Sequence, residues 1–188
     1  MANTSEQLSA YAGRVKPLAA ICAKTGDRID SLIDPIIQQL RLNDHRIIGL
    51  QQRLVSEGVS GCSVRLQSIN TGELHRITQN LGAGSVSCNI DIEAMDRVAL
   101  SLMAELNEEV ELLFVNRFGK RESQGSGFCG VIERAIELSI PVLTVVREGW
   151  QESWLDYGGE WVATLPAEHA SILSWCEQVL QRGVTKTA

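Results

Sequence analysis

Three short and almost continuous apolar runs constrain the fold more than any other feature of the sequence. They are LAAICA at 18–23, LLFV at 112–115 and PVLTVV at 141–146, and amphipathic segments separate them. Strands that are apolar on both faces are typical of a parallel sheet with helices on both sides. The sequence therefore predicts an α/β fold, a three-layer sandwich around a mostly parallel sheet.

Helical spacing of apolar residues between these runs predicts the covering helices. The pattern Ile29, Leu32, Ile33, Ile36, Ile37, Leu40 predicts a helix over about 29–42. Pro35 lies inside this pattern, so it either opens a shorter helix behind Asp34 as N-cap or kinks a longer one. Further helices are expected at 92–106 behind Asp91, at 127–138 and at 171–180, and further strands at 47–50 and, more weakly, 159–166.

The middle of the chain carries a different pattern, that of a β-hairpin. SVRLQSI at 63–69 and LHRITQ at 74–79 flank the turn sequence NTGE. We expect this hairpin, at about 62–78, to be an insertion into the alternating pattern. The expected organisation is a single domain over 17–182, with an N-terminal tail over 1–16 and a C-terminal tail over 183–188.

Composition and charge exclude several classes of function. The chain of 188 residues is 44% hydrophobic, which is enough for a core, and its net charge of −6 argues against binding of nucleic acid. No apolar run reaches the roughly 18 residues of a membrane-spanning helix, and the first residues have no signal-peptide pattern. The five cysteines are widely spaced and form no CxxC pair, which argues against a disulfide framework or a zinc site. A cytoplasmic protein without membrane insertion is expected.

Basic residues follow the predicted parallel strands where each strand ends. They lie in AKTGDR after Cys22, in NRFGKRES after Val115, and at Arg147 after Val146. The carboxyl ends of parallel strands meet at one edge of the sheet, where ligands bind in such folds. Three basic loops at one edge of an acidic protein predict a local anion site.

The first of these loops has the layout of a phosphate-binding loop but few of its residues. In the pattern GxxxxGK[ST], glycines free the backbone N–H groups, the lysine reaches the phosphates and the hydroxyl holds magnesium. Ile29 stands at the lysine position and Asp30 at the hydroxyl position, and Gly26 is the one glycine of the loop. The candidate anion contacts are Lys24, Thr25, Gly26, Asp27 and Arg28. The alternative is an ordinary strand-to-helix turn capped by Asp30 or Ser31.

The second loop, NRFGKRES, is more distinctive. Arg117 offers a bidentate fork to an oxyanion and Lys120 a point charge, whereas Asn116 is neutral where a nucleotide hydrolase has an acid. The alternative is a solvated charged loop. Cys62 and Cys88, at the base of the hairpin, are candidate soft ligands, the alternative being two unrelated cysteines. The sequence leaves open whether a metal binds.

Several of these segments, in this order, also carry a resemblance to a known family. AAICAKTGDRIDSLI, TGELHRITQNLGAGSVSCNID, VNRFGKRESQGSGF and IPVLTVVRE resemble an uncharacterised bacterial family encoded near molybdate ABC transporter genes. That family is similar to small nucleoside-triphosphatases with a P-loop core and an inserted hairpin. The resemblance implies a P-loop NTPase type of sheet with a degenerate Walker A loop, in which Gly119 and Lys120 match the later GKxE-like turn.

Three functions are compatible with these residues. The first is a non-catalytic oxyanion-binding protein for molybdate or tungstate, serving molybdenum homeostasis, with molybdate-transport or molybdenum-cofactor proteins as partners and a homodimer as a candidate assembly. The second is a nucleotide-binding phosphohydrolase with an unconventional loop, in which Asp27 or Asp30 lies near magnesium and Lys24 lies on phosphate. The third is a partner-binding protein with a vestigial ligand site. Loss of the catalytic lysine, hydroxyl and acids favours the first.

Overall fold

The computed structural model of the chain describes residues 15–56, 62–78 and 90–181, except for the side chains of residues 54–56, 62 and 63. The strands are β1 (Leu18–Ala23), β2 (Ile47–Ser56), β3 (Cys62–Ser68), β4 (Leu74–Arg76), β5 (Leu112–Phe118), β6 (Val142–Arg147) and β7 (Val162–Pro166). The helices are α2 (Ile29–Leu42), α3 (Ile92–Glu105), α4 (Cys129–Glu137), α5 (Gln151–Gly158) and α6 (His169–Leu180).

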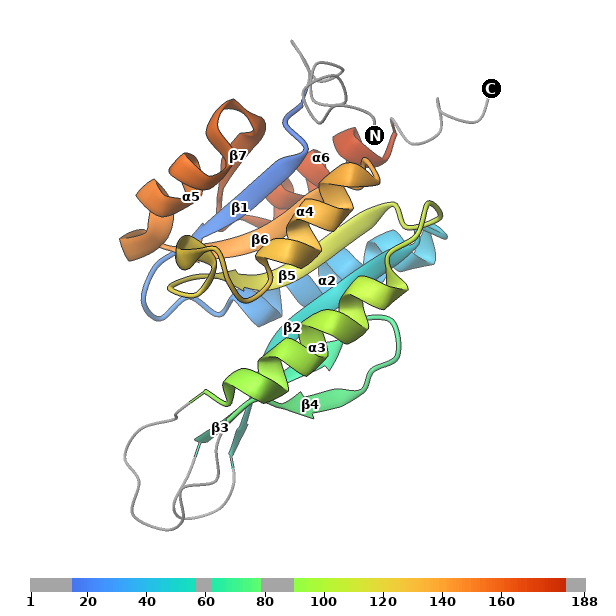
Figure 1. Cartoon of the computed structure of the whole chain (residues 1–188). Helices are drawn as coiled ribbons and strands as arrows, with labels where there is room; N and C mark the ends of the chain where they lie inside the picture. The colour runs from blue at the N-terminus through green and yellow to red at the C-terminus, as the bar shows by residue number, and fades with distance from the viewer. Residues whose placement is uncertain (1–14, 57–61, 79–89, 182–188) are drawn as a thin grey trace.

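One sheet organises the molecule, as Figure 1 shows. Its strand order is β4-β3-β2-β5-β6-β1-β7. The pairs β2–β5, β5–β6, β6–β1 and β1–β7 are parallel, whereas β3 pairs antiparallel with both β2 and β4. The expected α/β fold with a mostly parallel sheet and a β-hairpin is therefore confirmed, and its arrangement is that of a P-loop NTPase-like sandwich.

Two hydrophobic cores lie on opposite faces of this sheet. Alternate residues of the strands point to opposite faces, so that Ala19 and Ile21 of β1 belong to one core and Leu18 and Ala20 to the other. Helices α2 and α6 contribute to the first core, and α3, α4 and α5 to the second. This two-sided burial explains why β1, β5 and β6 read as almost continuous apolar runs.

Some details differ from the expectation. Helix α2 begins at Ile29 and continues through Pro35, so the shorter helix with Asp34 as N-cap is wrong. Strand β2 continues to Ser56, well beyond Leu50, and forms a second antiparallel pair with the hairpin. The expected N-cap of α3 is confirmed, because the Asp91 carboxylate accepts a hydrogen bond from the Ala94 N–H at 3.0 Å.

Helix α5 has no counterpart among the expected elements. Its single fully buried side chain, Trp154, packs edge-on against Phe118 of β5, and Tyr157 stacks beside it. One buried residue in a helix of eight leaves no 3.6-residue pattern to detect. The helix nevertheless places the chain on the α4 side of the sheet after β6.

The connections of β1 and β6 leave the sheet toward opposite faces. The loop after β1 leads to α2, whose buried side chains belong to one core, and the segment after β6 leads to α5, whose Trp154 belongs to the other. Since β1 and β6 are neighbours, their carboxyl ends form the kind of switch point at which ligands bind in open parallel sheets. The fold thus singles out this edge as the place for a ligand.

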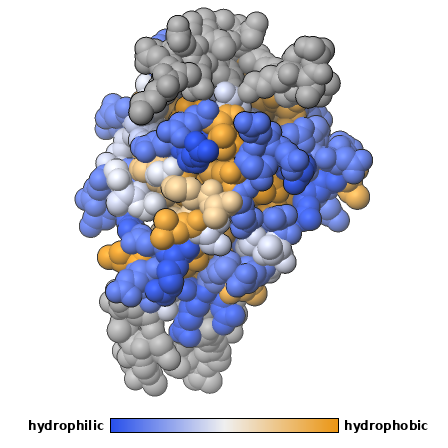
Figure 2. Space-filling model, turned by 45° about the vertical axis from the view of Figure 1, so that its right-hand side comes forward, coloured by the Kyte–Doolittle hydropathy of each residue, from blue (hydrophilic) through white to orange (hydrophobic). Residues whose placement is uncertain are grey.

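The described surface is mainly hydrophilic on the face that Figure 2 shows, with apolar side chains between the polar ones near its middle. The large exposed hydrophobic side chains among the described residues are spread over α2, β4, α3, α5 and the residue two positions before α3: Leu42, Leu74, Ile92, Leu100, Leu155 and Ile90. Among the described residues, no helix combines the length and the apolar character needed to cross a membrane.

Candidate functional site

Five residues, 24–28, join β1 to α2, and all of them are exposed. The Asp27 carboxylate accepts a hydrogen bond from the Lys24 backbone N–H at 2.6 Å, and Gly26 takes a positive φ of 97° at the tip. The loop therefore closes on its own aspartate, which holds a backbone donor that a phosphate loop would present to its ligand. Ile29, which the sequence analysis aligned with the lysine of a phosphate-binding loop, is the first residue of α2 and packs, partly buried, against the core.

The N-terminus of α2 opens toward the same edge of the sheet. Its N-cap is Arg28, which makes no side-chain capping hydrogen bond, so neither Asp30 nor Ser31 caps the helix. Asp30 lies in the first turn and is half-buried. A helix N-terminus carries partial positive charge and free N–H groups, which favour an anion next to it.

A β-bulge in β5 sets the direction of the two residues that matter most. Val115 pairs with Thr144, but Phe118 pairs with Val146, so three steps on β5 face two on β6. Val115 and Phe118 belong to the same core, on the α4 side. Asn116 and Arg117, the residues between them, are therefore free to turn toward α2, and bulges often re-aim side chains in this way near functional sites.

Electrostatic effects link Arg117 with the first turn of α2 and the end of β6. Burial lowers the pKa of Arg117, the neighbouring Arg147 lowers it further, and Asp30 raises it. Burial also raises the pKa of Asp30. The positive charges of Arg53 and, more weakly, Arg117 lower it. Charged residues of β5, β6, β2 and α2 thus influence one another's pKa values.

Two buried polar atoms at this edge have no hydrogen-bond partner. They are the Oδ1 atom of Asn116, whose side chain is 5% exposed, and the Nε atom of Arg117. Neither guanidinium of Arg117 and Arg147 forms an ion pair with a carboxylate in the described ranges. Unsatisfied buried polar groups are rare in proteins, and a ligand is one of the usual reasons for them.

The site predicted from the sequence is brought together in part. Ala23 pairs with Arg147, so the loop 24–28 starts directly beside the β6 end, next to the bulge with Asn116 and Arg117. Lys120 is exposed and forms no ion pair with a described residue. The side chain of Cys62 and the whole of Cys88 lie outside the described residues. Within the described ranges, no three His, Cys, Asp or Glu residues gather as a metal site would require.

Sequence reasoning missed a carboxylate–guanidinium pair that borders the site. Arg53 of β2 binds Asp34 of α2 through two hydrogen bonds of 2.9 and 2.7 Å, and Gln51 donates to the same carboxylate. The pKa of Asp34 is lowered mainly by the hydrogen bond to Arg53. The available signal was the polar stretch QQR after IIGL, which becomes informative only once β2 is known to continue past Leu50.

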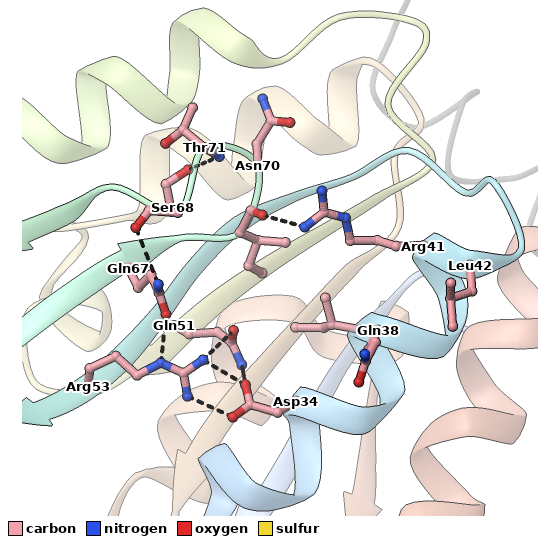
Figure 3. Close-up of a pocket in the computed structure, with 13 residues that line it drawn as sticks. Asp34, Gln38, Arg41, Leu42, Gln51, Arg53, Gln67, Ser68, Asn70 and Thr71 are labelled. Carbon is pink, nitrogen blue, oxygen red and sulfur yellow. Dashed lines mark hydrogen bonds and ion pairs between the residues drawn. The ribbon is translucent and has the colours of Figure 1, made fainter.

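This pair also forms one wall of a groove of about 550 Å³ between α2 and the hairpin, which Figure 3 shows. Toward the C-terminal end of α2, Arg41 donates a hydrogen bond to the Ile69 carbonyl at 2.9 Å. Gln67 accepts a hydrogen bond from Arg53 and donates one to the Gly72 carbonyl in the turn. The polar side chains of this wall mostly satisfy one another. We therefore interpret these side chains as the packing contact between α2 and the hairpin.

Comparison with known proteins places the chain in a family. A family model described as "Protein of unknown function (DUF2478)" matches residues 18–175. The Molybdenum import ATP-binding protein ModC 2 of Bradyrhizobium diazoefficiens is 33% identical over 167 residues, which are 88% of this chain and 18% of that protein. The chain thus spans less than a fifth of the length of this relative, and no solved structure matches it. Because the family model covers most of the chain, the chain belongs to the DUF2478 family.

Proposed function

We propose that the chain binds a tetrahedral oxyanion, molybdate or tungstate, at the edge formed by the ends of β1, β5 and β6, without catalysing a reaction. The observation that carries this proposal is the pair Arg117 and Arg147. Burial and Arg147 both destabilise the charge on Arg117, and no described carboxylate is bonded to either guanidinium. An anion between them would relieve the repulsion and provide the charge-assisted hydrogen bonds that guanidinium groups make best.

The same residues argue against hydrolysis of a nucleotide. A magnesium ion is held by carboxylates, a hydroxyl and substrate phosphates. Here Asp30 is the carboxylate whose charge acts on Arg117, and Arg53 and Arg117 both act on it with positive charge. Ile29 is apolar and packs, partly buried, against the core, and Asn116 is neutral. These residues are a poor fit for magnesium and a better one for an anion alone.

The choice of molybdate or tungstate rests on the similarity to a named relative and not on the geometry of the site. The relative ModC 2 is named for molybdenum import. We therefore propose a role in molybdenum homeostasis in the cytoplasm, with molybdate-transport or molybdenum-cofactor proteins as partners. The three free cysteines among the described residues, Cys22, Cys129 and Cys176, agree with a reducing compartment.

A nucleotide-binding phosphohydrolase remains the second candidate, because the relative is named an ATP-binding protein and the N-terminus of α2 has no side-chain cap. In that case the phosphates would lie at α2, with Lys24 beside them and Asp27 or Asp30 near magnesium. A partner-binding protein with a vestigial site is the third.

Thermal unfolding of the full chain against a ligand panel separates the three functions. The panel holds molybdate, tungstate, sulfate, phosphate, and ATP with and without magnesium; a ligand of the folded state raises the midpoint by mass action. We expect molybdate and tungstate to raise it and Arg117→Gln or Arg147→Gln to remove the effect. Arg97→Gln, on the exposed face of α3, removes the same charge elsewhere and should keep it. A rise with magnesium and ATP alone would support the phosphohydrolase, and a flat panel the partner-binding protein.

A further inference from the structure

The two residues of the β5 bulge, Asn116 and Arg117, need an anchor outside their own side chains. The Asn116 Oδ1 atom and the Arg117 Nε atom are buried and have no hydrogen-bond partner. An atom without a partner does not hold its side chain in one orientation. The direction of both side chains must therefore come from the backbone that carries them.

That backbone enters the bulge through a carbonyl group that a buried hydroxyl holds. The Thr144 hydroxyl of β6 donates a hydrogen bond of 2.6 Å to the Val115 carbonyl of β5, and Thr144 is fully buried. Val115 and Thr144 are the last pair before the register shifts. A peptide group is planar, so the Val115 carbonyl and the Asn116 N–H lie in one rigid plane. The hydroxyl thus sets the direction in which the chain starts the bulge.

Packing alone does not explain a hydroxyl at this position. The other residues of 142–146 are valine and leucine. A valine would fill nearly the same volume as Thr144, and a buried hydroxyl is costly unless it is hydrogen-bonded. What the hydroxyl adds to the core is the bond to the Val115 carbonyl.

The backbone leaves the bulge at a second fixed point. Phe118 is fully buried, and its ring centroid lies 5.2 Å from that of Trp154 and 5.3 Å from that of Tyr157. Both partners belong to α5, which follows β6 in the chain. The segment from β6 to α5 therefore holds both ends of the bulge, and it also carries Arg147.

We propose that Thr144 is a positioning residue of the oxyanion site, because its hydroxyl holds the Val115 peptide so that Arg117 faces the anion together with Arg147. The inference rests on the oxyanion site proposed above. Since Thr144 is fully buried, it acts through the bulge and not by contact with the anion.

Two substitutions at Thr144 separate the hydroxyl from the volume of the side chain. Thr144→Val puts a methyl group where the hydroxyl stood. A carbon atom contacts a carbonyl oxygen at about 3.3 Å or more, which is longer than the hydrogen bond of 2.6 Å, so the Val115 peptide must move. Thr144→Ser loses a methyl group and leaves a small gap in the core, but it keeps the hydroxyl.

Isothermal titration of the full chain with sodium molybdate at neutral pH tests the proposal. We expect the dissociation constant to rise by about tenfold in Thr144→Val, the weight of one hydrogen bond. It should stay within about twofold of the unmodified value in Thr144→Ser. Urea unfolding of the free variants accompanies the titration, and Thr144→Ser should unfold at a lower urea concentration than the unmodified chain. A side chain that only stabilised the fold would change this midpoint and leave the affinity of the folded chain unchanged.

Thr164 of β7 provides the matched control. It pairs with Ala20 of β1 from one side as Thr144 does from the other, and its side chain is exposed. Thr164→Val removes a hydroxyl from the same sheet and should bind molybdate as the unmodified chain does. If Thr144→Val fails to fold, Thr144→Ala is compared with Thr144→Ser, because both lack the methyl group and only serine keeps the hydroxyl.

The outcomes separate this proposal from the one beneath it. Unchanged molybdate affinity in folded Thr144→Val, or an equal loss in Thr144→Ser or Thr164→Val, would overturn the role of Thr144 and leave the oxyanion site standing. Absence of molybdate binding to the unmodified chain would overturn both.

Discussion

At the scale of single residues, Glu122 shows how one buried carboxylate shapes the loop after β5. The side chain is 4% exposed, and its two oxygens accept hydrogen bonds from the backbone N–H groups of Gly119 and Phe128, each at 3.1 Å. The Cys129 thiol donates to the Glu122 carbonyl at 3.2 Å. Glu122 thereby closes the segment that begins at the bulge with Arg117, and it holds the start of α4 in place.

We therefore expect Glu122→Ala to lower the free energy of unfolding by about 3 kcal/mol, since hydrogen bonds to a charged group contribute about 1.5–3 kcal/mol each and two buried donors would be left unpaired. Urea denaturation measures the change. Glu133→Ala, an exposed residue of α4, should change it by less than about 0.5 kcal/mol. Equal effects of the two substitutions would mean that Glu122 does not organise the loop.

Asp34 supports a second prediction at this scale. The hydrogen bond to Arg53 lowers the pKa of Asp34 in the folded chain, so the pair stabilises the fold fully above the ordinary aspartate pKa of about 4 and less as pH falls below it. Asp34→Asn should cost less than about 1 kcal/mol near pH 6, because the pair is partly exposed. The difference from the unmodified chain should shrink toward about pH 3.

Chemical denaturation at both pH values tests this, with Asp156→Asn on the exposed side of α5 as the matched loss of a carboxylate. A difference for Asp34→Asn that grows on acidification would show that the Arg53 pair does not stabilise the folded state.

At the scale of elements, local patterns were sufficient wherever a strand is covered on both faces. β1, β5 and β6 were predicted from apolar runs, and α2 from its spacing, because burial leaves a strong periodic signal. The continuation of β2 past Leu50 was not predicted, since its residues are mixed and its partner is the hairpin. The bulge in β5 was also missed, because it is a property of register between two strands and not of either sequence alone.

Gly49 of β2 supports a prediction about the pairing of elements. It takes a φ of 145°, and a Cβ atom there would overlap the backbone carbonyl of its partner Phe114 in β5. Gly49→Ala should therefore lower the free energy of unfolding by about 3 kcal/mol or more, because backbone atoms of a central strand cannot yield as a flexible side chain does. Gly149→Ala meets no atom within 4 Å and serves as the control. A midpoint of urea unfolding for Gly49→Ala equal to that of Gly149→Ala would contradict the close approach.

At the scale of the whole molecule, the sequence predicted the edge of the sheet that carries the candidate site but not its full composition. Basic loops after parallel strands must meet, so Arg117, Arg147 and the loop 24–28 could be brought together from topology alone. The Asp34–Arg53 pair could not, because it joins α2 to a strand extension that the pattern did not reveal. Cys88 lies outside the described residues, and its role stays a prediction.

The two cores share a single sheet, and this arrangement supports a final prediction. Ile33 of α2 and Ile132 of α4 are both at most 1% exposed but belong to different cores, with the sheet between them. Each Ile→Val substitution should cost about 0.5–1.5 kcal/mol. The double variant should cost their sum within about 0.5 kcal/mol, because separated sites without shared partners are additive. Urea unfolding followed by circular dichroism measures all four states of this cycle, and Ile92→Val, at a 58% exposed position, should be nearly neutral.

Since every strand of the parallel part contributes to both cores, each variant should still unfold in one transition. Two separate transitions, or strong coupling between the two substitutions, would contradict a sheet that acts as one rigid layer between independent cores.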